Sequence, residues 1–420
     1  MTGNKLLKMS ADLERYMASY DGLMGRPENR KHMRRFARGQ LGPIERKSLE
    51  PIADAEGVEP RSLQQFFSHC VWEEGVVRDE LQKRVAKAYG SEEGIFVIDE
   101  TSDAKKGEFT AGVSRQYCGE SGKVDNCIVT VHMGYVSGDK HALIDGELFL
   151  PESWNPDPRQ PEIGLRRKRA KVPEHVVHVS KAEMALKQLE RAKANGVPGR
   201  YVGADEGYGG KPWWRAAVDG LGYIYVVEVP KSTAGWMRKP KFRLPRWKGR
   251  GRPPTRREAT TRSKTVAEWG RDGKVRWLMP WTRYRVHDTE KGPEVWEVKA
   301  GRLWEGGENG PRKAQMLLVA RHVLSGEEKY FLCNAPEGTS MEKLLQVAFS
   351  RWRIERCFQD CKTELGLNHA EIRTYRGIHR HLTLTAVNYF FLGEWMRRHA
   401  KAGEKRSDGE SVCRCDSEAA

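Results

Sequence analysis

Three acidic residues that lie far apart in the chain, Asp99, Asp205 and Glu355, have the type and setting expected of metal ligands. Asp99 and Asp205 each end a short apolar run of the kind that forms a buried strand. Carboxylates are hard oxygen ligands, and Mg²⁺ is usually held by one or two of them together with water and phosphate oxygens. Two such ions about 3.5–4 Å apart stabilise the attacking and leaving oxygens of a phosphoryl displacement. The three acids therefore indicate phosphodiester chemistry, although any one of them alone would more often be structural.

Three further acids, Glu100, Asp103 and Glu206, lie beside the two aspartates. Successive side chains of a strand point to opposite faces of its sheet. We therefore expect these neighbours to point away from the side that Asp99 and Asp205 share.

The third acid lies in a segment whose pattern predicts one long helix over 341–367. Arg351, Glu355 and Lys362 follow the spacing i, i+4 and i+11, which places them on one face of that helix. A cation on each side of a metal-binding acid suits the grip of a phosphodiester beside the metal. A solvated helix with Arg–Glu pairs would show the same spacing, so the spacing alone leaves both interpretations open.

The charge of the chain favours a polyanionic partner. Its 420 residues include 73 Lys and Arg against 57 acidic residues, a formal charge of +16. Cations that neutralise phosphates release counterions from nucleic acid, and the two clusters at 166–171 and 246–257 are suited to this. Within the second cluster, Arg250 and Arg252 of GRGRPP resemble a hook that enters a narrow minor groove; contacts to phosphates are an equally good interpretation.

The N-terminal region contains the layout of a helix-turn-helix over 52–69, with Gly57 at the turn and Pro60 at the start of the second helix. Residues of this second helix would then meet DNA as a recognition helix does, and they are Arg61, Gln64 and Gln65. An ordinary pair of packed helices fits the segment equally well.

Other features exclude classes of protein. No run of eighteen apolar residues and no signal peptide is present, so we expect no membrane span and a cytoplasmic, nucleoid-associated protein. The eight cysteines lack the CxxC spacing of a zinc site and are expected to be structural. His369, His379 and His381 are likewise expected to form structural hydrogen bonds rather than to reach the metal.

Strands are predicted over 112–119, 126–136, 141–151 and 223–229, and helices over 180–196 and 379–399. Five segments follow from these patterns: a helical DNA-binding domain (1–90), the first part of an α/β catalytic core (91–230), a β-rich insertion (231–340), a helical completion of the core (341–400) and a polar tail (401–420).

The segment RWRIERCFQDCKTELGL resembles the signature of the Tyr-Arg-Glu-Lys branch of DDE insertion-sequence transposases, which Arg351, Glu355 and Lys362 match. The tyrosine of that signature is replaced here by Ala348, followed by Phe349. IFVIDETSDAKKG and YVGADEGYG resemble the segments of the two aspartates, so Asp99 and Asp205 correspond to them.

The resemblance implies an RNase H-like α/β fold, in which a mixed five-stranded sheet with flanking helices is interrupted by a β-rich insertion. It implies two Mg²⁺ ions, which Mn²⁺ replaces, held by the three acids for cleavage of double-stranded DNA at the element's ends and strand transfer into a target. A homodimer in the synaptic complex, often with a DNA hairpin, is also implied, and Trp296 or Trp304 would hold a flipped base. A transposase-derived DNA-binding protein without catalysis is the main alternative, and another RNase H-like nuclease ranks below it.

Overall fold

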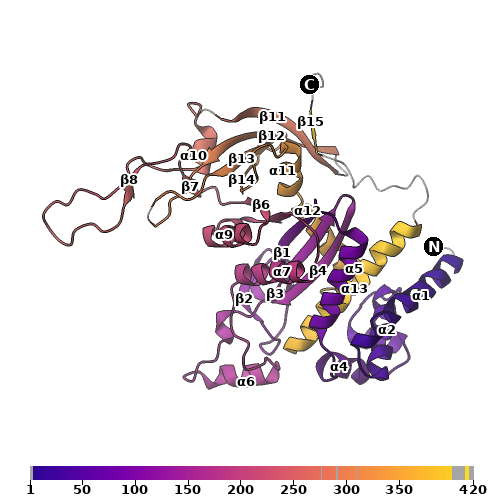
Figure 1. The fold of residues 1–420 in the computed structure, drawn as a ribbon. Helices are drawn as coiled ribbons and strands as arrows, with labels where there is room; N and C mark the ends of the chain where they lie inside the picture. Colours follow the sequence, from indigo (N-terminus) through magenta and orange to yellow (C-terminus); the bar gives the residue numbers. More distant parts are fainter. Residues whose placement is uncertain (1–2, 276, 290–291, 309, 400–411, 416–420) are drawn as a thin grey trace. The chain divides into compact units, whose positions relative to one another are not determined.

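The computed structural model describes residues 3–275, 277–289, 292–308, 310–399 and 412–415 (Figure 1). The chain divides into two compact units. Unit 1 comprises residues 1–199 and 352–405, and unit 2 comprises residues 200–351 and 406–420. Most of the polar tail expected at 401–420 lies outside the described residues.

Unit 1 begins with helices, as the sequence predicts for 1–90. Proline occupies the first helical position of two of them, where its missing N–H costs nothing. Most of these helices lie beside the long C-terminal helix (Figure 1). That helix is buried along most of its length. These helices are α1 (Gly3–Ala18), α2 (Pro27–Leu41), α3 (Leu49–Ala55), α4 (Pro60–Ser68), α5 (Glu74–Tyr89) and α13 (Tyr375–His399), with the 3₁₀ turn η1 (Asp21–Leu23) between α1 and α2.

The strands of unit 1 form an antiparallel sheet, and they lie where the apolar runs and turns of the sequence predict strands. The central strand β3 pairs with each of the other three. Asp99 was expected to end its strand, but the strand continues for five more residues, so Asp99 lies in its interior. The strands are β1 (Ile95–Ala104), β2 (Ser114–Cys118), β3 (Lys123–Ser137) and β4 (Lys140–Leu148).

Three more helices complete unit 1. Helix α7 (Lys181–Ala194) is the one predicted over 180–196, and it starts at a capping box in which the side chains and backbone N–H groups of Ser180 and Glu183 are bonded reciprocally. Helix α6 (Pro161–Arg169) follows the 3₁₀ turn η2 (Glu152–Trp154), and α12 is assigned Arg351–Leu365.

Unit 2 contains a mixed sheet whose strand order is β15-β11-β12-β13-β14-β6-β5. Its parallel pair β5–β6 is connected through α8 and α9, and β14 pairs antiparallel with β6. The strands of the expected insertion therefore continue the sheet that β5 and β6 begin. The elements of this sheet are β5 (Tyr201–Ala204), α8 (Glu206–Gly209), α9 (Pro212–Gly220), β6 (Ile224–Glu228), β11 (Met279–Thr289), β12 (Gly292–Leu303), β13 (Gln315–His322), β14 (Glu328–Cys333) and β15 (Cys413–Arg414).

Short elements cover the remainder of unit 2. A two-residue ladder joins β7 (Ala234–Gly235) to β10 (Lys264–Thr265), and a second joins β8 (Phe242–Arg243) to β9 (Glu258–Ala259). Helix α10 (Val266–Arg271) begins at a capping box and buries Val266. Val266 packs with apolar residues of the sheet into one core, which includes Leu303, Leu317, Val319, Tyr330 and Leu332.

The long helix predicted over 341–367 is divided in two. Helix α11 (Met341–Ala348) ends before Phe349, and α12 starts at Arg351. Phe349 leaves the helical path because its ring packs between Trp296 and Phe331, at centroid distances of 5.0 and 5.5 Å. The described residues therefore form a mixed α/β protein, with an antiparallel sheet in unit 1 and a mixed sheet in unit 2.

Candidate functional site

Asp99 occupies a defined face of the sheet in unit 1. It is paired with His132 of β3, and residues directly opposite each other on antiparallel strands share a face. Asp99 is 7% exposed, and its Oδ1 accepts a hydrogen bond from the N–H of Glu100 at 2.8 Å. By alternation along β1, Thr101 and Asp103 are on the same face as Asp99, whereas Glu100 is on the opposite face.

Helix α7 covers the opposite face. Lys181 of α7 forms an ion pair with Glu100, and the side chain of Gln188 donates to the carbonyl oxygen of Val131 at 3.0 Å. Glu100 therefore points away from Asp99, as predicted. The same prediction was wrong for Asp103, because four residues along a strand restore the same face.

Helix α12 covers the face that carries Asp99. Ile354 packs over Gly134 of β3, where an added Cβ would lie 3.3 Å from the Ile354 side chain. One turn further on, the ring of Phe358 lies 5.1 Å from that of His132, centroid to centroid. Glu355 follows Ile354 in this helix and is exposed. Unit 1 thus places Asp99 on the sheet face covered by the helix that carries Glu355.

The surroundings of Asp99 contain an uncharged histidine that the sequence did not single out. Burial, assisted by the positive charge of Lys362, lowers the pKa of His132 to about 3. Its Nε2 lies 2.8 Å from Oγ1 of Thr130. The sequence does contain a signal for His132, which is the single histidine in the apolar run NCIVTVHMGYV. A polar ring within a buried strand needs a hydrogen-bond partner.

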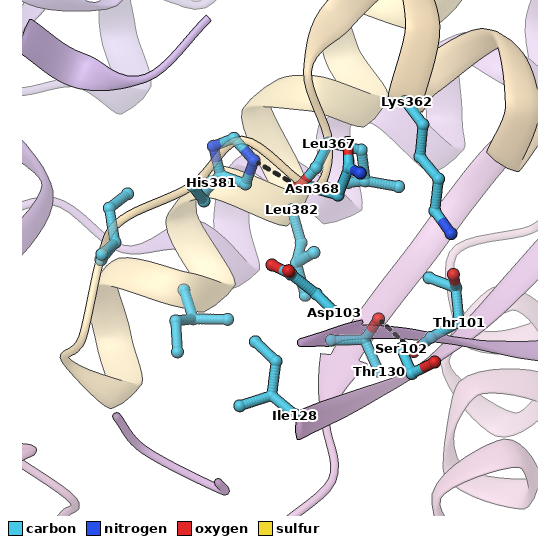
Figure 2. Close-up of a pocket in the computed structure, with 13 residues that line it drawn as sticks. Thr101, Ser102, Asp103, Ile128, Thr130, Lys362, Leu367, Asn368, His381 and Leu382 are labelled. Carbon is cyan, nitrogen blue, oxygen red and sulfur yellow. Dashed lines mark hydrogen bonds between the residues drawn. The ribbon is translucent and has the colours of Figure 1, made fainter. Parts of the chain in front are cut away.

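A cavity of about 30 Å³ lies on the same face, further along β1. Its walls include Thr101 and Asp103 of β1 and His381 of α13, and Figure 2 shows Lys362 extending from α12 toward Thr101. The volume suffices for about two water molecules. Burial raises the pKa of Asp103 to about 6, although its ion-pair partner Lys105 acts in the opposite direction. Lys362, predicted to grip DNA, therefore lies on the Asp99 face.

Asp205 belongs to unit 2, where it directly follows β5 and caps the short helix α8. Its Oδ1 accepts the N–H groups of Gly207 and Tyr208, at 2.9 and 3.4 Å. Among the described residues, Oδ2 accepts no hydrogen bond. Asp205 is half-buried, and its hydrogen bonds to α8 fix the direction of its carboxylate.

The donor set fits a hard divalent cation, because all three proposed ligands are carboxylates. Asp99 and Glu355 belong to unit 1 and Asp205 to unit 2. Within the described ranges, no group of three or more His, Cys, Asp or Glu side chains is placed so that it could hold a metal ion.

The signature helix departs from expectation at its start. Arg351, the first residue of α12, is half-buried, and Ala348, which replaces the signature tyrosine, ends α11. Phe349 is 9% exposed within the core of unit 2 and does not replace the tyrosine at a surface. Trp296, predicted to hold a flipped base, is 4% exposed against Phe349, so that prediction was wrong. Trp304 is half-buried.

Helices α3 and α4 form the predicted helix-turn-helix layout, with Gly57 at a φ of 63° in the turn. Arg61, Gln64 and Gln65 are all exposed on α4. The opposite face of α4 is buried, with Leu63, Phe66 and Phe67 at 0% exposure.

Arg380 of α13 holds the end of α4 in place. Its guanidinium donates to four backbone carbonyl oxygens, those of Phe66, Phe67, Cys70 and Trp72, at 2.5–3.1 Å. It also lies 4.5 Å above the ring of Trp72. The exposed face of α4 is therefore presented on a rigid support.

The two basic clusters differ in structure. Arg250 and Arg252 are exposed in the segment that connects the paired strands β8 and β9, which Figure 1 shows extending from unit 2. In the other cluster, Arg167 is 6% exposed and donates to the carbonyl oxygens of Trp154, Pro173 and Val176. Arg167 therefore has a structural role that its setting in a basic run concealed.

All three histidines form hydrogen bonds, as expected. Backbone N–H groups donate to two of them, from Lys47 to His369 at 3.0 Å and from Leu148 to His379 at 3.3 Å. His381 Nε2 lies 3.1 Å from the carbonyl oxygen of Leu367. No helix in the described part of the chain is both long and apolar enough to span a bilayer.

Comparisons with known proteins show which family this chain resembles. A family described as DDE superfamily endonuclease matches residues 20–293. The chain is also 35% identical over 94 residues to a protein of Microchaete diplosiphon described as a probable transposase for insertion sequence element IS701. This second match covers 22% of the chain and only 25% of the relative's length. The family match spans well over half of the chain and includes both aspartates, and the protein therefore belongs to the DDE superfamily endonucleases.

Proposed function

We propose that this protein is the transposase of an insertion sequence, which cuts DNA at the ends of its element and joins them to a target. One observation carries the proposal: Asp99 lies on the sheet face that is covered by α12, the helix of Glu355 and Lys362. Family membership and the partial likeness to a probable transposase support it.

We propose that Asp99, Asp205 and Glu355 together hold two Mg²⁺ ions, which Mn²⁺ can replace. Bound ions would supply charge stabilisation to the attacking and leaving oxygens of an in-line phosphoryl displacement. The protein's own part is to hold each carboxylate still: Asp99 within a buried strand and Asp205 through its bonds to Gly207 and Tyr208. In this proposal the second aspartate comes together with the first and with Glu355.

Positive and polar side chains would hold the DNA. Lys362 and Arg351 lie on α12 on either side of Glu355, where we infer that they contact phosphates next to the cut. Arg61, Gln64 and Gln65 present the donors and acceptors that read base edges in a major groove. Arg250 and Arg252 would enter a minor groove or bind phosphates.

The proposed function also implies a particular fold and assembly. The antiparallel meander β1–β3–β4, the covering helix α7 and the parallel pair β5–β6 are the parts that an RNase H-like core requires. We infer such a core, and a homodimer that brings two double-stranded ends together.

The test uses the full chain, duplex DNA from the flanks of its gene, and Mn²⁺. Cleavage by Asp99→Asn, Asp205→Asn and Glu355→Gln should fall by more than about a hundredfold, beyond the usual cost of losing an outer-shell partner. Binding to the same DNA without metal should change less than about twofold, because the three acids are not the DNA contacts.

Two matched controls lie beside the tested acids. Glu100→Gln changes an acid on the opposite face of β1, and Glu206→Gln changes the exposed neighbour of Asp205; both should keep cleaving. Retained cleavage in any of the three ligand variants would reject that residue as a ligand. A wild-type chain that binds the ends but never cuts them would point to a DNA-binding relative without catalysis.

A further inference from the structure

A closed cluster of buried polar side chains lies next to the turn of Asp205, and neither the family signature nor the sequence patterns point to it. The cluster is formed by Arg215 of α9, Glu305, which follows β12, and Gln315 of β13. These residues are 2%, 6% and 8% exposed. Burial of a charged pair is costly unless its partners are well placed, so a cluster of this kind needs a reason in the structure.

The three side chains are bonded to one another in a ring. Arg215 Nη2 forms an ion pair with Oε2 of Glu305, and Nε of Arg215 donates to Oε1 of Gln315 at 3.2 Å. The amide of Gln315 donates to the same Glu305 oxygen at 2.7 Å. The hydroxyl of Tyr225 on β6 donates to Oε1 of Gln315 at 2.7 Å and ties the ring to the sheet.

A further hydrogen bond of Arg215 connects the ring to the turn that contains Asp205. Nη1 of Arg215 donates to the carbonyl oxygen of Gly209, the last residue of α8. Gly209 lies so close to β6 that a Cβ at this position would collide with the carbonyl oxygen of Glu228. The far end of α8 is therefore held between the sheet and a guanidinium that cannot shift without breaking the ring.

The near end of the same helix holds the carboxylate of Asp205. Its Oδ1 accepts the N–H groups of Gly207 and Tyr208, so the direction of the carboxylate is set by the position of α8. Helix α8 has only four residues and cannot hold this position through its own backbone hydrogen bonds. A fixed anchor at Gly209 supplies what the helix lacks.

We propose that Arg215, held by Glu305 and Gln315, is the positioning residue of Asp205, so that strands of the β-rich segment set the geometry of the second metal ligand. This inference rests on the proposed function of Asp205. It gives the segment 231–340 a part in the site that requires no contact with DNA, because Glu305 and Gln315 act through the backbone of α8.

The primary variant is Arg215→Lys, which keeps the charge but lacks the planar fork that serves three acceptors at once. Hydrogen–deuterium exchange of a peptide over 205–211, measured by mass spectrometry without metal, should be at least about tenfold faster at Gly207 and Tyr208 than in the wild type. The Mn²⁺ concentration for half-maximal binding, titrated by electron paramagnetic resonance, should rise about 10- to 100-fold.

Two further variants keep the test decisive. Tyr225→Phe removes one hydroxyl from the ring without leaving a buried charge unpaired, and it should shift both readouts in the same direction by a smaller factor. Lys299→Met removes another buried cation of unit 2, whose ammonium donates to the carbonyl oxygen of Gly270, and should leave both readouts at wild-type values. Thermal unfolding of all variants reports whether they fold.

The outcomes separate this inference from the proposed function. Wild-type exchange and Mn²⁺ binding in a folded Arg215→Lys protein would overturn the positioning role, even if Asp205→Asn abolished cleavage. Faster exchange at Gly207 in Arg215→Lys, combined with a wild-type chain that neither binds Mn²⁺ nor cuts DNA, would uphold the anchor of α8 and reject the metal site itself.

Discussion

Asp99 and His132 face each other across the β1–β3 ladder, and the ring of His132 contacts Phe358 of α12. Because the pKa of this histidine is lowered to about 3, the contact between the sheet and the helix of Glu355 is uncharged at neutral pH. The spacing between the first acid and this helix is therefore set by packing, and changes in side-chain volume should alter it.

Gly134 gives the sharpest test of that spacing. Gly134→Val should push α12 from the sheet, since even a Cβ there lies 3.3 Å from Ile354. Overpacking of this kind lowers the free energy of unfolding by about 1–3 kcal/mol, and a displacement near 1 Å lowers cleavage by on the order of a hundredfold. Denaturant unfolding and the cleavage assay measure the two effects. Adding Ile354→Val, which removes the nearest methyl group, should restore part of the unfolding free energy and part of the cleavage. If neither recovers, the contact between Gly134 and Ile354 does not position α12.

The pH dependence of the unfolding free energy should reveal the raised pKa of Asp103. Its folded pKa of about 6 exceeds its ordinary value of 3.8, so the folded state binds the proton more tightly than the unfolded state. The stabilisation from this proton is complete below pH 3.8 and is lost as the pH rises through 6. The free energy of unfolding of the wild type, taken relative to Asp103→Asn, should fall by about 2–3 kcal/mol between pH 3.5 and pH 7. Urea titrations at the two pH values measure it, and a constant difference would contradict the assignment.

Arg380 should be essential to the DNA-reading helix. Arg380→Met leaves four buried carbonyl oxygens without their donor, which should cost at least about 3 kcal/mol of unfolding free energy and weaken DNA binding. The control Arg376→Met, one turn earlier on α13, removes a half-exposed arginine 3.9 Å from Glu73 and should cost less than about 1 kcal/mol. Equal losses from both variants would argue against the anchor.

Substitutions of Gln64 and Arg252 should have different effects on DNA binding, because we propose that Gln64 reads bases and Arg252 binds phosphates. Gln64→Ala should weaken binding to the element's ends by about 1–3 kcal/mol and leave binding to unrelated duplexes unchanged. Arg252→Ala should weaken binding to both and reduce the salt dependence, by about 0.9 in the slope of log K against log[salt] if it contacts one phosphate. Fluorescence anisotropy over a range of salt concentrations distinguishes the two patterns. Loss of all duplex binding in Gln64→Ala would contradict a role in base reading.

The sequence predicted those parts of the fold that local pattern controls. Apolar runs and turns located the strands of unit 1, and the capping residue Ser180 marked the start of α7. The end of the first strand was misplaced because residues after Asp99 are polar, yet they continue the ladder with β3. The break at Phe349 was also missed, since the helical periodicity runs on unbroken and only tertiary packing against Trp296 and Phe331 interrupts it.

The candidate site was predictable to a similar degree. A signature helix and two acid-ended runs marked the acids, because those residues lie within short recognisable segments. His132 and Arg215 were not found, since each acquires its role from a partner far away in the chain. Asp103 was noticed but was placed on the wrong face of its strand. The sequence also could not show that Arg252 is exposed whereas Arg167 is buried, because both lie in similar runs of basic residues.

Arg380 and His381 are consecutive residues of α13. Arg380 donates hydrogen bonds to the end of α4, and His381 lines the cavity beside β1 (Figure 2). A displacement of α13 would therefore disturb the end of α4 and the cavity wall together, because the two residues are adjacent in one helix. Engineering the sequence preference of α4 by exchanging that helix would have to preserve this junction. If the proposed function holds, variants of α4 that disturb this junction should lose DNA cleavage together with DNA binding.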